Sequence, residues 1–281
     1  MNEPLVSVCI PTYNGEKYIR EALDSISRQT YSNIELIVSD DKSTDKSLQI
    51  VNDVTKDWNV PVYIYNHIPS GIGANWNNCV KHARGKYIKF LFQDDLIYPN
   101  CISELVAVAE KDEGIGMVFC ERDLLTDSKA DNEWIKSISD LSNNWKELNE
   151  IQDGKNLLNQ QTFLDFPTNK IGEPSIVLIK KKCFDVSGYF SEQLKQTLDC
   201  EYWYRLMKDF KIGFVNKSLA AFRIHVEQAS QVNKSFSLHN EYYLYYRLMK
   251  RNLYSYLSQR SKRKIWYRLI RHFVLKYFKD S

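Results

Sequence analysis

The stretch Leu5-Val6-Ser7-Val8-Cys9-Ile10-Pro11-Thr12-Tyr13-Asn14 decides the fold that we expect for this chain. Its apolar run at 5–10 predicts a buried strand, which the following proline ends. Further along, strand-like runs at 34–38, 62–65, 87–92 and 117–120 alternate with helical patterns at 16–29, 43–58, 75–83 and 100–111. This alternation is typical of crossover units, so the sequence predicts an α/β fold with a mostly parallel sheet.

The remainder of the chain is less regular. A polar stretch at 123–161, which contains Trp134 and Trp145, is interpreted as a variable insertion that serves as a lid or an acceptor loop. A strand at 175–180, a helix at 199–208 and short strands near 211–215 and 220–223 follow. We therefore expect a catalytic domain at 1–230, divided into a nucleotide-binding half (1–120), the insertion (121–165) and an acceptor-binding half (166–230), and a helical tail at 231–281.

Charge is distributed unevenly along the 281 residues. The net charge is +3, from 38 Lys+Arg and 35 Asp+Glu, but residues 241–281 alone carry +9 and the preceding residues carry −6. A basic tail on an acidic body predicts an anionic partner for the tail. Nucleic acid is the weaker candidate, because the basic residues are confined to the tail and no nucleic-acid-binding module is recognisable.

Cysteine usage and hydropathy indicate the part of the cell in which we expect the protein. The six cysteines include no C-x-x-C pair, and most lie in apolar runs, which favours reduced thiols in the core. No basic-then-apolar leader and no run of 18 apolar residues is present in the sequence. We expect a cytoplasmic protein that is peripheral at the inner face of a membrane.

Polar clusters follow three of the predicted strands. They are Pro11-Thr12-Tyr13-Asn14, Asp40-Asp41 and Asp94-Asp95. Ligands of open α/β sheets bind beyond the carboxyl ends of the strands, so these clusters point to a binding site. Adjacent carboxylates repel each other, and a divalent cation that also grips a diphosphate would offset this cost. The alternative for Asp94-Asp95 is a solvated turn.

The opening stretch begins a longer series of motifs. It is followed in order by Leu23-Asp24-Ser25-Ile26, Glu35-Leu36-Ile37-Val38, Ala83-Arg84-Gly85-Lys86-Tyr87, Gln93-Asp94-Asp95, Gly172-Glu173-Pro174-Ser175 and Asp199-Cys200-Glu201-Tyr202-Trp203. This series resembles the family 2 glycosyltransferases. The resemblance covers about residues 5–228 apart from the insertion. It implies the GT-A fold and an inverting, metal-dependent transfer of sugar from a nucleoside diphosphate.

The resemblance assigns the donor side of the site. Pro11, Thr12 and Tyr13 correspond to the base-binding strand end, and Asp41 to the acid that accepts a hydrogen bond from the base. Asp94 would hold the ribose and Asp95 would ligate Mn²⁺ or Mg²⁺, although Gln93 replaces an acid that is common in the family's D-x-D motif. Asn75 would lie near the donor. Packing of Tyr13 beside the helix start is the alternative to stacking on the base.

The resemblance also assigns the reacting groups. Asp199 corresponds to the catalytic base that deprotonates the acceptor hydroxyl, with helix capping as a compatible alternative. Arg223 and His225 would contact phosphate or metal, although a lone histidine is more often an ordinary polar residue. Glu173, Ser175 and Glu201 would lie by the sugar or the acceptor. We expect Asp41, Asp95 and Asp199 to converge around one cleft.

The tail pattern suggests how the acceptor is reached. Ile265, Trp266, Leu269, Ile270, Phe273, Val274 and Tyr277 recur at helical spacing, with basic residues on other faces. This pattern predicts an amphipathic helix on an anionic membrane, or a helix packed on the core. The expected donor is a UDP-sugar, with dTDP second, and the acceptor a glycan or lipid-linked glycan of surface polysaccharide synthesis. The alternatives are a non-catalytic nucleotide-sugar or glycan-binding module and a membrane scaffold.

Overall fold

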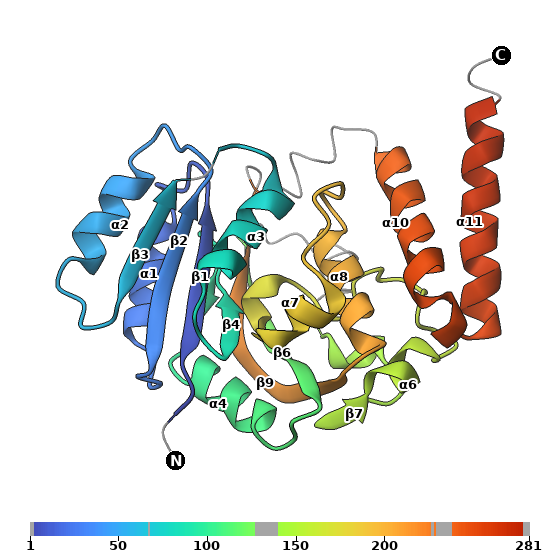
Figure 1. Cartoon of the computed structure of the whole chain (residues 1–281), viewed down its shortest axis with the longest axis horizontal. Coiled ribbons are helices and arrows are strands. Elements are labelled where there is room, and N and C mark those ends of the chain that lie inside the picture. The colour runs from blue at the N-terminus through green and yellow to red at the C-terminus, as the bar shows by residue number, and fades with distance from the viewer. Residues whose placement is uncertain (1–2, 67, 127–139, 226–227, 229–237, 278–281) are drawn as a thin grey trace.

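A computed structural model describes residues 3–66, 68–126, 140–225, 228 and 238–277 (Figure 1). Its N-terminal half is a parallel sheet with helical crossovers. The strands are β1 (Val6–Thr12), β2 (Ile34–Asp40), β3 (Val62–Asn66) and β4 (Tyr87–Phe90), and the helices between them are α1 (Ile19–Ser27), α2 (Ser47–Thr55) and α3 (Ile72–His82).

The second half extends the same sheet. Its strands are β5 (Leu96–Ile97), β6 (Ile115–Thr126), β7 (Ile151–Asp153), β8 (Val177–Lys180) and β9 (Lys211–Ile224). Its helices are α4 (Cys101–Ala109), α6 (Gly154–Leu158), α7 (Lys182–Ser187), α8 (Leu198–Met207), α10 (Leu238–Leu253) and α11 (Gln259–Tyr277), with 3₁₀ turns η1 (Ser142–Asn144), η2 (Pro174–Ile176) and η3 (Tyr254–Tyr256). The strand order is β3-β2-β1-β4-β8-β6-β9-β5, with β7 paired to β9.

Strand direction places the site. β8 is antiparallel to both β4 and β6, and β6 is parallel to β9, so β6 and β9 run in the same direction as β1 to β4. The mixed, mostly parallel α/β sheet that the sequence predicts is confirmed. β1 and β2 are in register, so that Thr12 pairs with Asp40, and the polar clusters at their carboxyl ends lie side by side.

Burial explains why these segments form strands and helices. Val6, Val8 and Ile10 on one face of β1 and Ser7 and Cys9 on the other are all fully buried, as expected for a parallel sheet covered on both faces. On α1 the buried residues are Ile19, Ala22, Leu23, Ser25 and Ile26, which recur at helical spacing on the face turned to the sheet. Continuous apolar runs thus become central strands, and 3.6-residue patterns become the covering helices.

The start of α2 differs from the prediction. The helical pattern in the sequence starts at 43, whereas the helix itself begins only at Ser47. Instead, Ser43 Oγ accepts from Asn14 N (2.9 Å), and Thr44 N donates to Asn14 Oδ1 (2.9 Å). These residues tie the loop after β2 to the loop after β1, and Asp45 Oδ1 accepts from Ser47 N (2.9 Å) at the helix start.

The segment 121–165 is not a detached loop where the structure describes it. β6 continues to Thr126 alongside β9, and β7 adds to the other side of β9. Trp145 is buried and donates from Nε1 to Lys170 O (3.2 Å). Residues 140–165 therefore contribute to the common core, whereas Trp134 lies outside the described residues.

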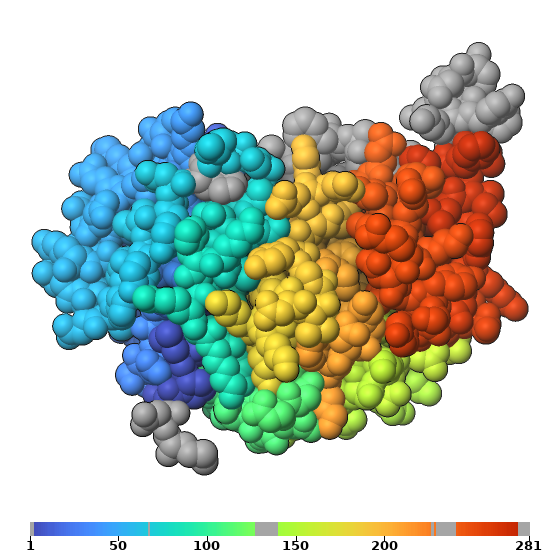
Figure 2. All heavy atoms as spheres, in the orientation of Figure 1, coloured from blue at the N-terminus to red at the C-terminus, as the bar shows by residue number. Residues whose placement is uncertain are grey.

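The structure also differs from the prediction at the two short strands and at the single tail helix. The regions 211–215 and 220–223 form one strand, β9, with bulges in its register against β6. The tail consists of two helices that pack on each other, α10 and α11, at the end of the molecule opposite α2 and β3 (Figures 1 and 2). Ser258 Oγ accepts from Ser261 N (3.3 Å), which caps the start of α11 and separates it from α10.

All six cysteines are buried and have free thiols, as expected. Within the described part of the chain, no helix is long and apolar enough to cross a bilayer.

Candidate active site

The carbonyl of Thr12 joins three predicted donor-site residues. It accepts from Asp41 N (2.8 Å), which links the ends of β1 and β2, and from Asn75 Nδ2 (3.3 Å) on the first turn of α3. Thr12 and Asn75 are buried, and Asn75 Oδ1 is a buried acceptor with no donor among the described residues. Thr12, Asp41 and Asn75 therefore form one cluster at the carboxyl edge of the sheet.

Tyr13 is presented to solvent from a clamped backbone. Its side chain is 57% exposed. Its N–H donates to Gln93 Oε1 (3.0 Å), and its carbonyl accepts from Gln93 Nε2 (3.0 Å). An amide can satisfy both groups of one peptide because it carries a donor and an acceptor. Gln93 thus fixes the peptide of the predicted base-stacking residue and leaves its ring accessible.

The two acids after β2 have different environments. Asp40 is buried, and its carboxylate accepts from Ser43 N (2.9 Å) and Ser43 Oγ (2.5 Å). Asp41 is half-exposed, with its backbone fixed by Thr12. Asp40 therefore shapes the loop, and Asp41 is the acid of the pair that solvent reaches.

Asp95 is fully buried and enclosed by hydrogen bonds. Its Oδ2 accepts from Ser175 Oγ (2.5 Å), and its Oδ1 accepts from Arg223 N (3.1 Å). Burial, and then the neighbouring Asp94 carboxylate, raise the pKa of Asp95 well above its ordinary value. The structure thus brings Asp95, Ser175 and Arg223 together, but it leaves Asp95 without an exposed oxygen. Each oxygen of Asp95 thus already accepts one hydrogen bond from the protein.

Asp94 faces the more open side of the pair. Its side chain is 21% exposed, and its Oδ2 lies 3.0 Å from His225 Nε2. His225 Nδ1 is buried without a hydrogen-bond partner among the described residues, and its ring lies 5.0 Å from that of Tyr18. The fold therefore brings Asp94 and His225, which are 131 positions apart in the sequence, into contact.

These side chains fit a divalent cation only in combination with substrate. No group of three or more His, Cys, Asp and Glu side chains that could hold a metal ion is found in the described part of the chain. Mg²⁺ and Mn²⁺ suit carboxylate oxygens and commonly take few protein ligands plus phosphate oxygens. The Asp94 carboxylate, with the imidazole of His225 beside it, provides such a partial donor set.

Arg223 is occupied by protein contacts. Its Nε donates to Asp94 O (3.0 Å), and its NH2 pairs with Glu21 Oε2 (2.7 Å) on α1. Its guanidinium also lies 4.5 Å from the centroid of the Tyr18 ring. The predicted phosphate contact of Arg223 thus competes with Glu21, and the observed role of this side chain is to fix the Asp94-Asp95 turn.

A buried lysine on β4 is linked to Asp95 through Ser175. Lys89 on β4 is fully buried, and its Nζ donates to Phe90 O (2.9 Å) and to Ser175 O. Burial lowers the pKa of Lys89, and the charge of Asp95 opposes this shift. Lys89 therefore holds the residue that hydrogen-bonds Asp95. Sequence reasoning missed it because a lysine on an apolar strand gives no direct signal of a buried partner.

Asp199 lies in the first turn of α8. It is half-buried, its Oδ1 accepts from Cys200 N (2.6 Å), and its Oδ2 accepts from Asn169 Nδ2 (2.9 Å). Burial raises the pKa of Asp199 to about 7, and Cys200 N–H partly opposes the shift. A carboxyl group with this pKa exchanges a proton near neutral pH, as a general base must.

Asn169 joins Asp199 to the loop that carries Glu173 and Ser175. Its Oδ1 accepts from Gly172 N (3.0 Å), and its Nδ2 donates to Gly172 O (3.0 Å) as well as to Asp199. Gly172 adopts φ +101°, which favours glycine. Sequence reasoning missed Asn169, whose only signal was an asparagine three residues before a glycine, a common turn pattern.

Glu173 connects the two acidic centres electrostatically. Its charge contributes to the raised pKa of both Asp95 and Asp199, so its carboxylate lies within range of each. Glu173 Oε2 pairs with Arg122 Nε (2.9 Å), and the Arg122 side chain is almost fully buried. Hydrogen bonds thus join Tyr13 to Gln93, Asp95 to Ser175 and Asp199 to Asn169, and the short chain segments 93–95 and 169–175 connect these pairs.

Glu201 is not part of this series of contacts. Its carboxylate pairs with Arg205 (2.9 Å) one turn along α8 and accepts from Asn252 Nδ2 (3.4 Å) on α10. Glu201 is buried. The structure therefore gives it a packing role between α8 and α10, which differs from the acceptor contact expected from the sequence.

Comparisons with known proteins agree with this architecture. The family model for glycosyl transferase family 2 matches residues 7–177. An uncharacterised glycosyltransferase of Rickettsia typhi is 30% identical over 228 residues, which are 81% of this chain and 66% of the relative. A further relative from Rickettsia felis is covered over only 36% of its length. The chain thus spans between about one third and two thirds of these relatives.

Solved structures share the fold at low identity. TarS 1-349 of S. aureus in complex with UDP-GlcNAc has a TM-score of 0.68 at 20% identity, covering 95% of this chain and 72% of that one. The mannosyltransferase PcManGT from Pyrobaculum calidifontis, in complex with GDP-Man and Mn²⁺, has a TM-score of 0.61 at 16% identity, with coverages of 91% and 64%. These likenesses establish the GT-A fold. The family model covers residues 7–177, more than half of the chain, and shows that this chain belongs to glycosyl transferase family 2.

Proposed function

We propose that this chain is an inverting glycosyltransferase that moves a sugar from a nucleoside-diphosphate sugar to a hydroxyl group of a glycan or lipid-linked glycan. One observation carries the proposal: Asp199, with a pKa of about 7, is braced by Asn169 to the loop whose Ser175 bonds Asp95. A proton acceptor and a carboxylate pair suited to a diphosphate are thereby held in one framework.

In the proposed reaction, Asp199 accepts the proton of the acceptor hydroxyl as its oxygen attacks the anomeric carbon. The bond from that carbon to the diphosphate oxygen breaks on the opposite face, so the configuration inverts and a nucleoside diphosphate leaves. The hydrogen bond from Asn169 fixes the carboxylate for this role. A positioned base of matched pKa contributes roughly 10²–10⁴-fold to rate.

On the nucleotide-sugar side, Tyr13 would flank the base. Asp41 would accept a hydrogen bond from the imino N–H of the base, a group common to uracil and thymine. Asn75 Oδ1, a buried acceptor that no described residue hydrogen-bonds, would receive a hydrogen bond from the nucleotide sugar. A UDP-sugar is the favoured donor, with dTDP second. TarS has been solved with UDP-GlcNAc and PcManGT with GDP-Man, so the relatives of this fold differ in nucleotide.

Asp94 and His225 would hold the divalent cation, in place of the Asp95 ligation expected from the sequence, because Asp95 is enclosed. Bound Mn²⁺ or Mg²⁺ would supply positive charge for the departing diphosphate. PcManGT contains Mn²⁺, which supports this use of metal. We expect Asp94→Ala to weaken donor binding in the presence of Mn²⁺, measured by calorimetry. Equal donor affinity with Mn²⁺ and with EDTA would contradict the metal role.

A screen of nucleotide sugars by thermal shift, with and without Mn²⁺, tests the proposal first. Stabilisation by one donor, followed by release of its nucleoside diphosphate in the presence of a glycan or lipid-linked glycan mixture, is the expected result. A donor that stabilises the protein but is never turned over would instead indicate a binding module. Failure of every nucleotide sugar to stabilise the protein would reject the proposal.

A further inference from the structure

Helix α11 presents large apolar side chains to solvent. Trp266, Tyr267, Ile270, Phe273 and Val274 are all exposed, Ile270 at 56% and Phe273 at 70%. Ile270 lies three or four residues from each of the other four, so the five share one side of the helix. The opposite side is already used, because Ile265 is fully buried and His272 stacks on Tyr243 of α10 at 4.1 Å. The exposed set, which we call the outer face of α11, is therefore additional to the packing face.

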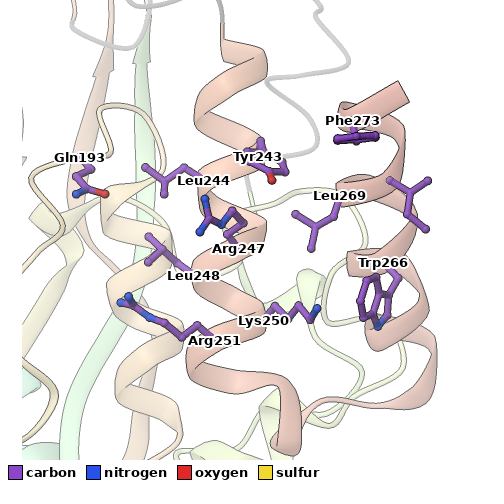
Figure 3. A pocket seen from close by; sticks show the side chains of 11 residues that line it. Gln193, Tyr243, Leu244, Arg247, Leu248, Lys250, Arg251, Trp266, Leu269 and Phe273 are labelled. Atoms are coloured by element: carbon purple, nitrogen blue, oxygen red, sulfur yellow. The ribbon is translucent and has the colours of Figure 1, made fainter. Parts of the chain in front are cut away.

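Cations of α10 lie beside this outer face. A groove with a volume of about 710 Å³ lies between the two helices where they do not touch (Figure 3). Its lining combines side chains of α10 and α11, including Arg247, Lys250, Arg251, Trp266, Ile270 and Phe273. Lys250 Nζ lies 3.5 Å from the centroid of the Trp266 ring, so charge and apolar surface are directly adjacent.

The charge of α11 has a single sign. Residues 259–277 contain seven Lys and Arg residues and neither Asp nor Glu. Arg260 and Lys264 pair with Asp165 of the catalytic domain. Lys262, Arg263, Arg268 and Arg271 have no ion pair with a carboxylate among the described residues. An apolar stripe with unneutralised cations beside it is complementary to a surface that has an apolar interior and an anionic outer layer.

We propose that the outer face of α11, together with the α10–α11 groove, docks this protein on an anionic phospholipid bilayer. The exposed apolar side chains enter the boundary between headgroups and acyl chains, with Trp266 and Tyr267 at the headgroup level. Arg247, Lys250 and Arg251 meet the lipid phosphates at the mouth of the groove. A second copy of the chain is the poorer occupant, because two such helices would bring like charges together.

This surface is connected to the candidate base. Glu241 at the start of α10 accepts hydrogen bonds from Gln196 N (2.6 Å) and Thr197 N (2.8 Å), just before α8 and Asp199. Contacts therefore join the helices of the docking surface to the helix that carries Asp199. The docking itself does not depend on sugar transfer, so the two proposals can fail separately.

Co-sedimentation of the full chain with vesicles tests the docking surface. We expect binding to vesicles of phosphatidylcholine with about 30% phosphatidylglycerol, weaker binding to phosphatidylcholine alone, and loss of binding in high salt. Phe273→Asp should reduce the bound fraction on anionic vesicles by roughly tenfold, since it places a charge where an apolar side chain inserts. Val186→Asp, at an exposed position on α7, is the matched control and should bind as the unmodified chain does.

Further readouts keep the result unambiguous. Circular dichroism and thermal unfolding of Phe273→Asp should match those of the unmodified chain, because Phe273 is exposed. Should Phe273→Asp itself prove unfolded, Arg247→Gln with Arg251→Gln replaces it, and these exposed changes should also reduce binding. Unchanged vesicle binding in folded Phe273→Asp would overturn the proposal. So would a dimer in solution, measured by light scattering, that Phe273→Asp converts to a monomer.

Discussion

At Asp199 two effects oppose each other. The N-terminus of α8 and the Cys200 N–H favour the ionised carboxylate, whereas burial favours the neutral acid. Burial is the larger effect and raises the pKa to about 7. The carboxyl group can therefore both release and accept a proton near neutral pH, which an ordinary surface aspartate, ionised throughout this range, does less effectively.

The pH dependence of transfer follows from this pKa. A general base acts only when it is ionised, so kcat/KM should rise with pH through about 7 and level off above it. The measurement is the initial rate of nucleoside diphosphate release between pH 5.5 and 8.5 in constant-ionic-strength buffers. A rate that is flat across this range would remove Asp199 from the role of base.

The stability of the protein should fall as pH rises through the range in which the transfer rate increases, because the same group titrates. The folded-state pKa of Asp199 lies above its ordinary value of 3.8, so the contribution of this group to stability is lost as pH rises towards about 7. Asp199→Asn removes that cost. After allowance for partial exposure, we expect the variant to gain roughly 1–2 kcal/mol relative to the unmodified chain between pH 5 and pH 8. Urea unfolding at both pH values measures it; a pH-independent difference would argue against the raised pKa.

Gln93 gives a prediction on the donor side. Gln93→Ala removes both hydrogen bonds to the peptide of Tyr13 and should raise the donor KM by about tenfold, with a smaller change in kcat. Gln93→Glu is the informative partner variant, because it keeps an acceptor for Tyr13 N–H but loses the donor to its carbonyl. A donor KM unchanged in Gln93→Ala would show that the clamp does not shape the nucleotide site.

Single residues were predictable from the sequence where a recognised motif stood at a strand end or a helix start. Thr12, Asp41 and Asn75 were singled out, and they do share one cluster. The enclosure of Asp95 was not predictable, because it depends on Ser175 and Arg223, which lie 80 and 128 residues further along the chain. The brace from Asn169 to Asp199 was missed for the same reason. Sequence patterns report local periodicity and carry little information on which distant side chain completes a hydrogen bond.

At the scale of elements, α10 is joined to α8 through one carboxylate. Glu241 Oε1 accepts from the backbone N–H groups of Lys195, Gln196 and Thr197 and from Thr197 Oγ1. These groups lie directly before the first turn of α8. Tyr245, one turn later, is fully buried, and its OH lies 3.5 Å from Cys200 Sγ. α10 thus supports the helix that carries Asp199.

Glu241→Ala tests this support. Loss of the charged acceptor should destabilise the protein by about 2 kcal/mol, in line with hydrogen bonds to charged groups. Because the charge of Glu241 contributes to the raised pKa of Asp199, the acidic limb of the pH–rate profile should also move to lower pH. Glu241→Gln, which keeps an oxygen acceptor, should be less destabilising. If Glu241→Ala unfolds at the same urea concentration as the unmodified chain, the support is negligible.

The order of strands and helices in the N-terminal half was largely predictable, because β1, β2 and their helices combine continuous apolar runs with clear 3.6-residue patterns. The division of the tail into α10 and α11 was not. Apolar residues continue at helical spacing on both sides of Ser258, and the break depends on that cap and on packing against α8. The pairing of β7 with β9 was likewise hidden in a polar segment, since edge strands of three residues leave no periodic pattern.

For the whole molecule, the tail is part of the fold as well as a candidate membrane surface. Tyr245, Met249 and Leu253 of α10 are buried in the common core. Removal of residues 241–281 would therefore expose apolar surface, and we expect this truncation to lower the melting temperature and reduce turnover of soluble acceptors. Thermal unfolding of the truncated chain measures this. A truncated protein as stable as the full chain would show that α10 packs only loosely.

The central claim is that one framework holds the donor site at the ends of β1, β2 and β4 and the base at the start of α8. The most direct measurement compares sugar transfer and donor binding in Asp199→Asn, with the unmodified chain as reference. We predict that transfer falls by at least about 10²-fold, while the dissociation constant of the nucleotide sugar, measured by calorimetry, changes less than about threefold. Retained transfer, or a parallel loss of donor binding in a folded variant, would contradict the account.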